Sequence, residues 1–215
     1  PAPHFFLILH AFPSKSNHRG ANLRLAIRCA LWYNECKAAT ENLVTADDFF
    51  KGVREMDIRL LSQRFTVRRL DARDVDIIFE LSRKNELFYK YHPPFITKEA
   101  ILDDMTALPP QKERTDKYYV GFFERGTLIA LMDLILAYPE PQTAFIGLFM
   151  MSTDYQGRGI ASEMIGDVRR CLKQLGYQKI RLGVDKGNPQ SFAFWSKNGF
   201  QVTGETEYIH QARVL

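Results

Sequence analysis

One glycine-rich turn constrains this chain more than any other stretch. The turn reads Asp-Tyr-Gln-Gly-Arg-Gly-Ile-Ala-Ser (residues 154–162), and it separates an apolar run, Ala144–Met151, from a helical pattern, Ile160–Leu175. A strand is therefore expected to enter a turn that opens directly into a helix. Backbone N–H groups at a helix start lack intrahelical partners, and the helix dipole adds partial positive charge there. Because glycine has no Cβ, a bulky anion can approach this backbone, and the turn predicts a phosphate-binding loop.

Composition limits the class of protein to which such a loop can belong. The chain has 215 residues, of which 46% are hydrophobic and 25% charged, as is ordinary for a globular protein. Its net charge of +4 suits an anionic ligand, whereas no long run of Lys or Arg indicates a nucleic-acid partner. Since no apolar run reaches the roughly 18 residues of a membrane helix, no membrane partner is expected either. We expect a monomer or a homodimer.

Cysteine usage indicates the compartment. Only Cys29, Cys36 and Cys171 occur, and they form no CxxC pair and no Cys/His cluster with zinc spacing. Neither a disulfide framework nor a metal site is therefore expected, and the cytoplasm is the expected location.

The first quarter of the chain differs in pattern from the remaining three quarters. Apolar residues recur at helical spacing from Asn22 to Ala39, and Met56 stands just before a strongly patterned region, where a start codon would be expected. We expect residues 1–55 to be a partly helical N-terminal extension, either of upstream origin or packed on the domain or on a partner. Residues 56–215 are expected to form one domain.

The pattern from residue 64 onward predicts a mixed α/β fold. Alternating or short apolar runs predict strands, and amphipathic stretches predict helices. The helix after the glycine turn leads to a short buried run, Lys179–Val184, so strand, helix and strand form one parallel unit. The remaining pairs are expected to be antiparallel, in a sheet of about seven strands flanked by about four helices. The last expected strand is Tyr208–Val214, and helices are expected to begin near Asp71 or Asp74, Thr97, Ile160 and Asn188.

Three known phosphate-loop patterns compete for the glycine turn. A Walker A loop ends in Gly-Lys-Ser or Gly-Lys-Thr, which this chain lacks. A dinucleotide fingerprint needs Gly or Ala at position 162, where Ser162 stands, and it needs further βα units for which little chain remains. Because the turn matches the dinucleotide fingerprint only in part, a dinucleotide-dependent enzyme is kept as an alternative function. The third pattern, Gln/Arg-x-x-Gly-x-Gly/Ala, is satisfied by Gln156, Gly159 and Ala161.

With the strand before this pattern, the helix after it, Asn188 and the closing stretch Lys197–Phe200, the sequence resembles the GNAT superfamily of acyl-CoA-dependent N-acyltransferases. The resemblance covers about residues 64 to 214. It implies an acyl-CoA N-acyltransferase-like fold, acetyl-CoA as co-substrate without a metal, and an amine acceptor. The implied function is transfer of an acetyl group from acetyl-CoA to a primary amine by direct attack in a ternary complex. The alternative is a non-catalytic, acyl-CoA-binding regulatory module.

The resemblance also implies how acyl-CoA is held. Backbone N–H groups from Gln156 to Ala161 would bind the pyrophosphate, and the strand before the turn would pair with the pantetheine arm. The asparagine that begins the next helix would bond to that arm. The acyl-CoA-binding residues expected on this basis are Phe149, Met150, Met151, Gln156, Gly157, Arg158, Gly159, Ile160, Ala161, Ser162, Asn188 and Trp195.

The proton steps are less constrained. Trp195 stands where relatives often have a tyrosine that protonates the leaving thiolate, and an indole cannot give up its N–H proton, although it can donate a hydrogen bond. Tyr208 and Tyr155 are weaker candidates for the group that protonates the leaving thiolate. For the general base, Asp133 is the first candidate, because it interrupts the apolar strand 128–137. The lesser candidates for the base are Asp185, Glu86 and His92.

Overall fold

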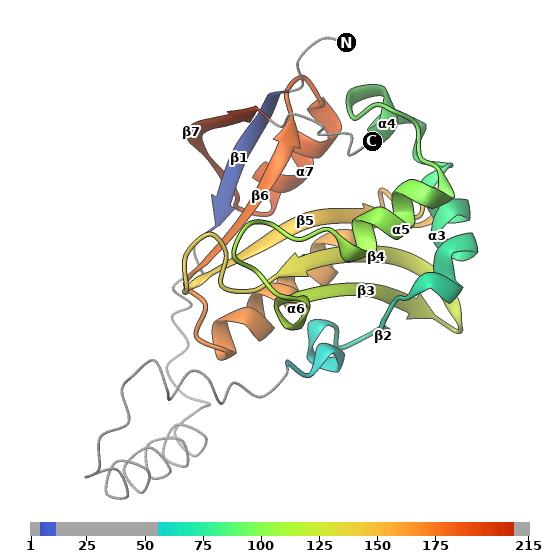
Figure 1. The fold of residues 1–215 in the computed structure, drawn as a ribbon, viewed down its shortest axis with the longest axis horizontal. Helices are drawn as coiled ribbons and strands as arrows, with labels where there is room; N and C mark the ends of the chain where they lie inside the picture. The colour runs from blue at the N-terminus through green and yellow to red at the C-terminus, as the bar shows by residue number, and fades with distance from the viewer. Residues whose placement is uncertain (1–4, 12–55, 209–215) are drawn as a thin grey trace, which may run out of the picture. The chain divides into compact units, whose positions relative to one another are not determined.

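A mixed sheet forms the centre of the fold (Figure 1). The computed structural model describes residues 5–11 and 56–208, so the helix predicted within residues 22–39 and the strand predicted over 208–214 lie outside the described residues, apart from Tyr208. The strand order is β2-β3-β4-β5-β6-β1-β7, with β5 and β6 parallel and the other neighbours antiparallel. The predicted mixed, mostly antiparallel α/β fold is confirmed. The strands are β1 (Phe5–Ala11), β2 (Thr66–Arg69), β3 (Lys117–Glu124), β4 (Thr127–Ile135), β5 (Thr143–Met151), β6 (Lys179–Asp185) and β7 (Gln201–Tyr208).

Side-chain caps fix the starts of the helices near the predicted positions. Thr97 accepts a hydrogen bond from the N–H of Ala100, and Asn188 accepts one from the N–H of Ser191. Helix α4 was not predicted as a separate helix. It ends at Tyr91, just before Pro93 and Pro94, which cannot continue a helix. The helices are α3 (Val75–Ser82), α4 (Glu86–Tyr91), α5 (Lys98–Thr106), α6 (Ile160–Gln174) and α7 (Pro189–Lys197).

Strand β1 comes from the segment that the sequence assigned to the extension. Phe5–Ala11 lies between β6 and β7 and is antiparallel to both. Leu9 and Ala11 are buried there, so these seven residues belong to the sheet of the domain. The sheet therefore has the predicted number of strands, but one of the seven, β1, was not predicted from the sequence.

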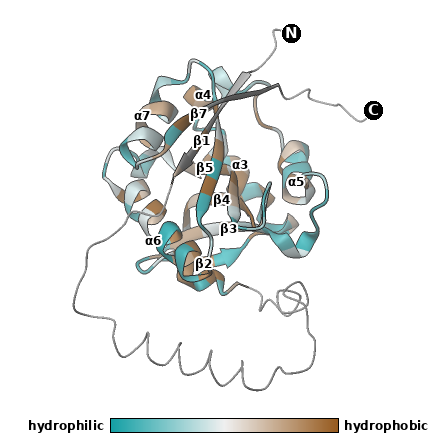
Figure 2. Ribbon diagram, turned by 90° about the vertical axis from the view of Figure 1, so that its left-hand side faces the viewer, coloured by the Kyte–Doolittle hydropathy of each residue, from teal (hydrophilic) through white to brown (hydrophobic). Residues whose placement is uncertain are grey.

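Helices cover both faces of the sheet. Helices α3 and α5 lie over one face and α6 lies behind the other (Figure 1), and hydrophobic residues gather on the central strands and on the inward sides of the helices (Figure 2). The cluster under α3 and α5 also includes residues of α4 and β3–β5. Its buried members are Leu70, Ile78, Leu81, Tyr89, Ile101, Tyr119, Phe123, Leu128, Leu131 and Met150.

The parallel pair β5 and β6 opens like a fork. The two strands are paired only from Thr143 opposite Lys179 to Ile146 opposite Leu182, although β5 continues to Met151 and β6 to Asp185. Just beyond the last pair, Gly147 is solvent-exposed in the middle of a central strand. The register between β4 and β5 also shifts there, because Leu134 faces Ile146 whereas Asp133 faces Leu148. Gly147 is thus the extra residue of a β-bulge at the base of the fork.

Three tyrosines predict a loss of stability at high pH. Burial raises the pKa of Tyr89 and of Tyr177 to about 12 each, and it raises the pKa of Tyr119 as well. Because unfolded tyrosines ionise near pH 10, above that pH the unfolded state binds fewer protons than the folded state. The free energy of unfolding is therefore expected to fall as pH rises from about 10 to about 12. Urea titrations across this range would measure the fall, and Tyr119→Phe should make it shallower. An unchanged slope in that variant would contradict the assignment to Tyr119.

Candidate active site

The glycine turn has the local geometry of an anion-binding helix start. After β5, a short 3-10 turn (Thr153–Tyr155) leads to Gly157 and Gly159, whose φ angles are +74° and +80°. L-residues with a side chain are strained in this left-handed region. A Cβ built on either glycine would meet no atom within 4 Å, so the space in front of this backbone is open. The first N–H groups of α6 point out of the helix here, and they offer donors to an anion.

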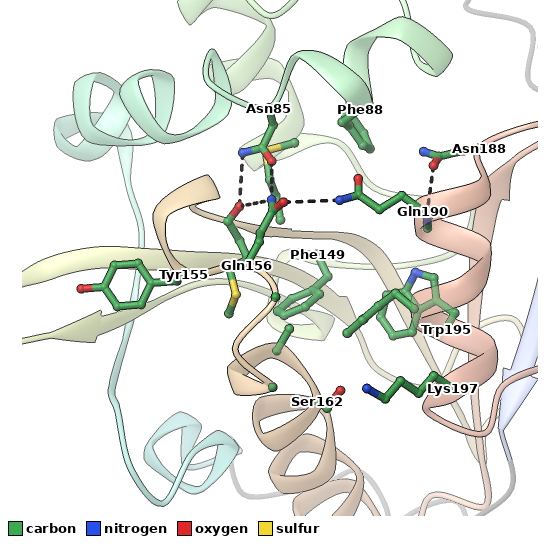
Figure 3. Close-up of a pocket in the computed structure, with 17 residues that line it drawn as sticks. Asn85, Phe88, Phe149, Tyr155, Gln156, Ser162, Asn188, Gln190, Trp195 and Lys197 are labelled. Carbon is green, nitrogen blue, oxygen red and sulfur yellow. Dashed lines mark hydrogen bonds between the residues drawn. The ribbon is translucent and has the colours of Figure 1, made fainter.

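A cavity of about 310 Å³ lies beside this turn. It is bounded by the turn and the start of α6 on one side, by the end of β5, and by α7 on the other side (Figure 3). Ten of the twelve predicted acyl-CoA residues line it. The exceptions are Arg158, which is exposed with its guanidinium 5.9 Å from the centre of the Tyr155 ring, and Ile160, whose side chain is buried. The predicted residues that line the cavity are Phe149, Met150, Met151, Gln156, Gly157, Gly159, Ala161, Ser162, Asn188 and Trp195.

The Gln156 side chain belongs to a hydrogen-bond network within the protein (Figure 3). Its Nε2 donates to Asn85 Oδ1 at 2.9 Å and to the carbonyl of Met151 at 3.1 Å, and its Oε1 accepts from Gln190 at 3.4 Å. The buried Asn85 also donates to the carbonyls of Leu81 and Met151. The network joins the segment between α3 and α4 to the glycine turn and to α7. The Gln156 side chain therefore braces the turn against α7 and the segment before α4.

The backbone of β5 turns toward the fork. Because the N–H of Ser152 donates to the carbonyl of Ile129 on β4 (2.8 Å), the alternation of an antiparallel ladder directs the backbone groups of Met151 and Phe149 to the opposite edge. The side-chain bonds that the Met151 carbonyl accepts from Asn85 and Gln156 agree with this direction. Phe149 thus presents an N–H and a C=O to the gap between β5 and β6, where an extended ligand could pair with them.

Aromatic rings form the wall of the cavity below α7. The rings of Phe149 and Phe194 are stacked with centroids 6.1 Å apart, and Trp195 meets Phe149, Phe194 and Phe200 edge to face. Trp195 is only 6% exposed, so its ring is fixed by packing. This wall is apolar, and Trp195 can contribute shape and one N–H donor but no proton.

Asp133 lies at the base of the fork, on the face covered by α3 and α5. Its Oδ2 accepts a hydrogen bond from Lys117 Nζ at 2.7 Å, and the two side chains are only 13% and 6% exposed. Burial raises the pKa of the Asp133 carboxyl, and the Lys117 ammonium opposes that rise. A Cβ on Gly147 would come within 2.8 Å of the same Oδ2, so the glycine leaves room for the carboxylate. The other oxygen, Oδ1, is buried without a hydrogen-bond partner among the described residues.

The other candidates for the proton steps lie in different surroundings. His92 and Asp185 meet, with Nδ1 and Oδ1 3.1 Å apart, whereas Glu86 is exposed on α4. A hydrogen bond with Glu124 raises the pKa of Tyr155, and the hydroxyl of Tyr155 points away from Trp195 (Figure 3). The side chain of Tyr208 lies outside the described part of the chain.

Several cavity residues were missed by the sequence reasoning. The α7 residues among them follow from helical spacing, because positions 190, 191, 194 and 195 share one face of the helix that Asn188 caps. Gly147 does not line the cavity, but it also carried a signal, since a glycine inside an apolar strand often marks a bulge. Asn85 carried no signal, because its partners are distant in sequence. The missed lining residues are Asn85, Phe88, Gln190, Ser191, Phe194 and Lys197.

The described segments contain neither a membrane-spanning helix nor a metal-binding cluster of side chains. No helix within residues 56–208 is long and apolar enough to cross a membrane. Over the same residues, His, Cys, Asp and Glu side chains form no group of three or more that could hold a metal ion.

Comparison with known proteins identifies relatives of this fold. The acetyltransferase (GNAT) family model matches residues 78–200, which is more than half of the chain. A spermidine N(1)-acetyltransferase from Thermoplasma acidophilum is 22% identical over 160 residues, covering 68% of this chain and 96% of that protein.

Two solved structures share the fold at low sequence identity. An acetyltransferase from Thermus thermophilus has a TM-score of 0.55 at 19% identity, and the match covers 67% of this chain and 97% of that one. The PaiA N-acetyltransferase from Thermoplasma acidophilum, in complex with coenzyme A, has a TM-score of 0.51 at 20% identity, with coverage of 67% and 99%.

Proposed function

Because this chain belongs to the acetyltransferase (GNAT) family and is an acyltransferase, we propose that it moves an acetyl group from acetyl-CoA to a primary amine. The observation that carries the proposal is the cavity that runs from the open glycine turn along the edge of β5 to Trp195. One end of this cavity suits an anion and the other is apolar. That is the polarity of a CoA thioester, from its pyrophosphate to its acyl group.

The residues present fit coenzyme A at each end of the cavity. The pyrophosphate would accept hydrogen bonds from the N–H groups of the glycine turn and the α6 start. The pantetheine arm would pair with the backbone of Phe149 at the open edge of β5. Asn188, which is buried and caps α7, lines the same cavity, and its amide would contact the arm.

Transfer would occur by direct attack in a ternary complex. Holding the amine against the thioester carbonyl supplies most of the rate enhancement through positioning, and an N–H of the β5 edge would polarise the carbonyl. Cys171 is a poor covalent intermediate, because burial raises the pKa of its thiol and it faces the core from α6. Since Trp195 cannot protonate the leaving thiolate, the sulfur would take its proton from solvent; free thiols have a pKa of about 8.5. The catalytic role of Asp133 stays a prediction.

Turnover with a panel of amines tests this proposal. The purified chain would be mixed with acetyl-CoA and each amine, and free thiol would be followed as CoA is released. Spermidine heads the panel because a relative carries its name, followed by diamines, lysine and peptide N-termini. Intersecting initial-rate lines would indicate a ternary complex. CoA binding without turnover of any amine would favour the regulatory module, and failure to bind CoA would overturn the proposal.

The role of the turn in donor binding can be tested at Gly159. Replacing it with alanine adds a methyl group in front of the open backbone, and the KM for acetyl-CoA is expected to rise by at least about tenfold, the equivalent of about 1.4 kcal/mol. Gly176→Ala is the matched control. Gly176 has a φ of +90° and equally open surroundings, but it does not line the cavity. Both variants should lose similar stability, whereas only Gly159→Ala should change the KM. An equal KM in the two variants would contradict anion binding at the turn.

A further inference from the structure

Two side chains far apart in sequence form an Asp–His pair at the rim of the fork. His92 follows α4, and Asp185 is the last residue of β6. Nδ1 of His92 lies 3.1 Å from Oδ1 of Asp185, although 93 positions separate the residues. The Asp185 side chain is 8% exposed and that of His92 is 40% exposed. A buried carboxylate thus holds a ring that the solvent, and therefore a substrate, can reach.

This pairing determines which nitrogen of the ring can act as a base. An ionised carboxylate only accepts hydrogen bonds, so Nδ1 of His92 must carry the proton that it donates to Asp185. Nε2 then carries the lone pair and is the proton acceptor. A carboxylate that fixes the tautomer and the orientation of an imidazole is the arrangement by which histidine bases are positioned in many enzymes.

The pair lies next to the proposed donor site. The ring of His92 contacts that of Phe88, with centroids 5.0 Å apart, and Phe88 lines the cavity. On the other side, Asp185 accepts through its carbonyl from the N–H of Asn188, which lines the cavity too. Asp185 is three residues beyond the last β5–β6 pair, as is Phe149 on β5. His92 and Asp185 therefore flank the fork at the level where β5 exposes its backbone.

His92 is more accessible to an amine than Asp133, because its side chain is 40% exposed and that of Asp133 is 13% exposed. The Oδ2 atom of Asp133 is bonded to Lys117, and its Oδ1 is buried, so an amine cannot reach either oxygen without a rearrangement. Two acidic groups face His92 from neighbouring elements, Asp185 on β6 and Asp104 on α5. Acidic neighbours favour the approach of a positively charged amine.

We infer that His92, held by Asp185, is the catalytic base that takes the proton from the acceptor amine. The inference rests on the proposed acetyl transfer. As the amine nitrogen bonds to the thioester carbon, its proton passes to Nε2 of His92 and from there to solvent. The C–S bond breaks, and the thiolate takes a proton from water, so the products are the N-acetyl amine and free CoA.

Variants at His92 test the inference through the pH profile. His92→Gln keeps a hydrogen-bonding side chain but cannot accept a proton at neutral pH, so kcat/KM is expected to fall by about 10²–10³-fold, with CoA affinity unchanged within about twofold. The acidic limb of the profile, where kcat/KM falls at low pH, should move to higher pH, toward the pKa of the amine itself. His92→Ala should be rescued in part by added imidazole. Asp185→Asn, which favours the wrong tautomer, should also lower kcat/KM, by at least about tenfold.

Two comparison variants make the result decisive. Lys90→Gln changes an exposed residue of α4, two positions before His92, and should leave kcat/KM unchanged. If His92 is the base, the Asp133→Asn variant should keep the acidic limb of the pH profile. If this variant loses the acidic limb, Asp133 is the base instead. Circular dichroism and CoA binding would show that the His92→Gln variant is folded. The inference is overturned if this folded variant retains the kcat/KM and the acidic limb of the wild-type protein. If the wild-type protein turns over no amine, the proposed function itself fails, which is a distinct outcome.

Discussion

Replacing Lys117 with methionine is expected to lower the free energy of unfolding by about 3–5 kcal/mol, because it leaves a buried carboxylate without its cation. The side chain of Asp133 is only 13% exposed, and its second oxygen is buried without a partner among the described residues. Burial already raises the pKa of Asp133, and the loss of Lys117 would raise it further. When the pKa of a carboxyl is raised in the folded state, the free energy of unfolding falls as pH increases. The difference in this free energy between Lys117→Met and the wild type should therefore be smaller near pH 5 than near pH 8. Urea unfolding at both pH values would measure it.

Two further variants separate a buried ion pair from a general effect of losing a lysine. The double variant Lys117→Met/Asp133→Leu should recover most of the lost stability, since apolar replacement of both partners removes the uncompensated charge. Lys179→Met is the exposed control. Lys179 is paired with Glu140 at 3.1 Å, but these side chains are 38% and 58% exposed, and its loss should cost less than about 1 kcal/mol. A double variant as unstable as Lys117→Met would contradict this account.

Gly147→Ala is expected to lower kcat/KM by about 100-fold, because it disturbs the base of the fork where β5 meets the proposed donor. The new Cβ would lie 2.8 Å from Oδ2 of Asp133, which is closer than real Cβ contacts allow. Since the same oxygen is held by Lys117 at 2.7 Å, either the ion pair or the bulge must move. We expect a loss of about 1–3 kcal/mol in stability as well. Steady-state kinetics and urea unfolding of the same preparation would measure both effects.

Gly166→Ala is the matched control for this variant. Gly166 lies inside α6, and a Cβ there would meet nothing within 4 Å. In a helix interior this change should stabilise the protein by about 1 kcal/mol, and it should leave kcat/KM unchanged. Wild-type activity in Gly147→Ala would show that the bulge tolerates a side chain and has no part in positioning the donor.

Local features of the chain were predictable because their causes lie within a few residues. The positive φ angles of Gly157 and Gly159, the Thr97 and Asn188 caps and the amphipathic α6 all follow from short-range chemistry. The predicted loop residues gather at one cavity for the same reason, since a strand, a turn and a helix in sequence fix their relative positions.

Features that join distant segments were not predictable from periodicity. Strand β1 comes from the segment assigned to the extension, and it pairs with the edge of β6. No local sequence pattern indicates that this edge is free to accept a strand. The sequence named Asp133 as an isolated acid within an apolar strand, but only the register between β3 and β4 brings Lys117 close enough to pair with it.

The sequence by itself determined the glycine turn, the parallel strand–helix–strand unit and the family to which they point. Its information is local, because glycine conformation, capping and periodicity depend on neighbours along the chain. Only the tertiary structure decided which side chains meet, since strand register and helix packing set distances between residues many positions apart. It joined Asn85 to Gln156 across 71 positions and His92 to Asp185 across 93. Two separate candidates for the base thus became one pair, because the fold brings His92, just after α4, to the buried carboxylate of Asp185 at the end of β6.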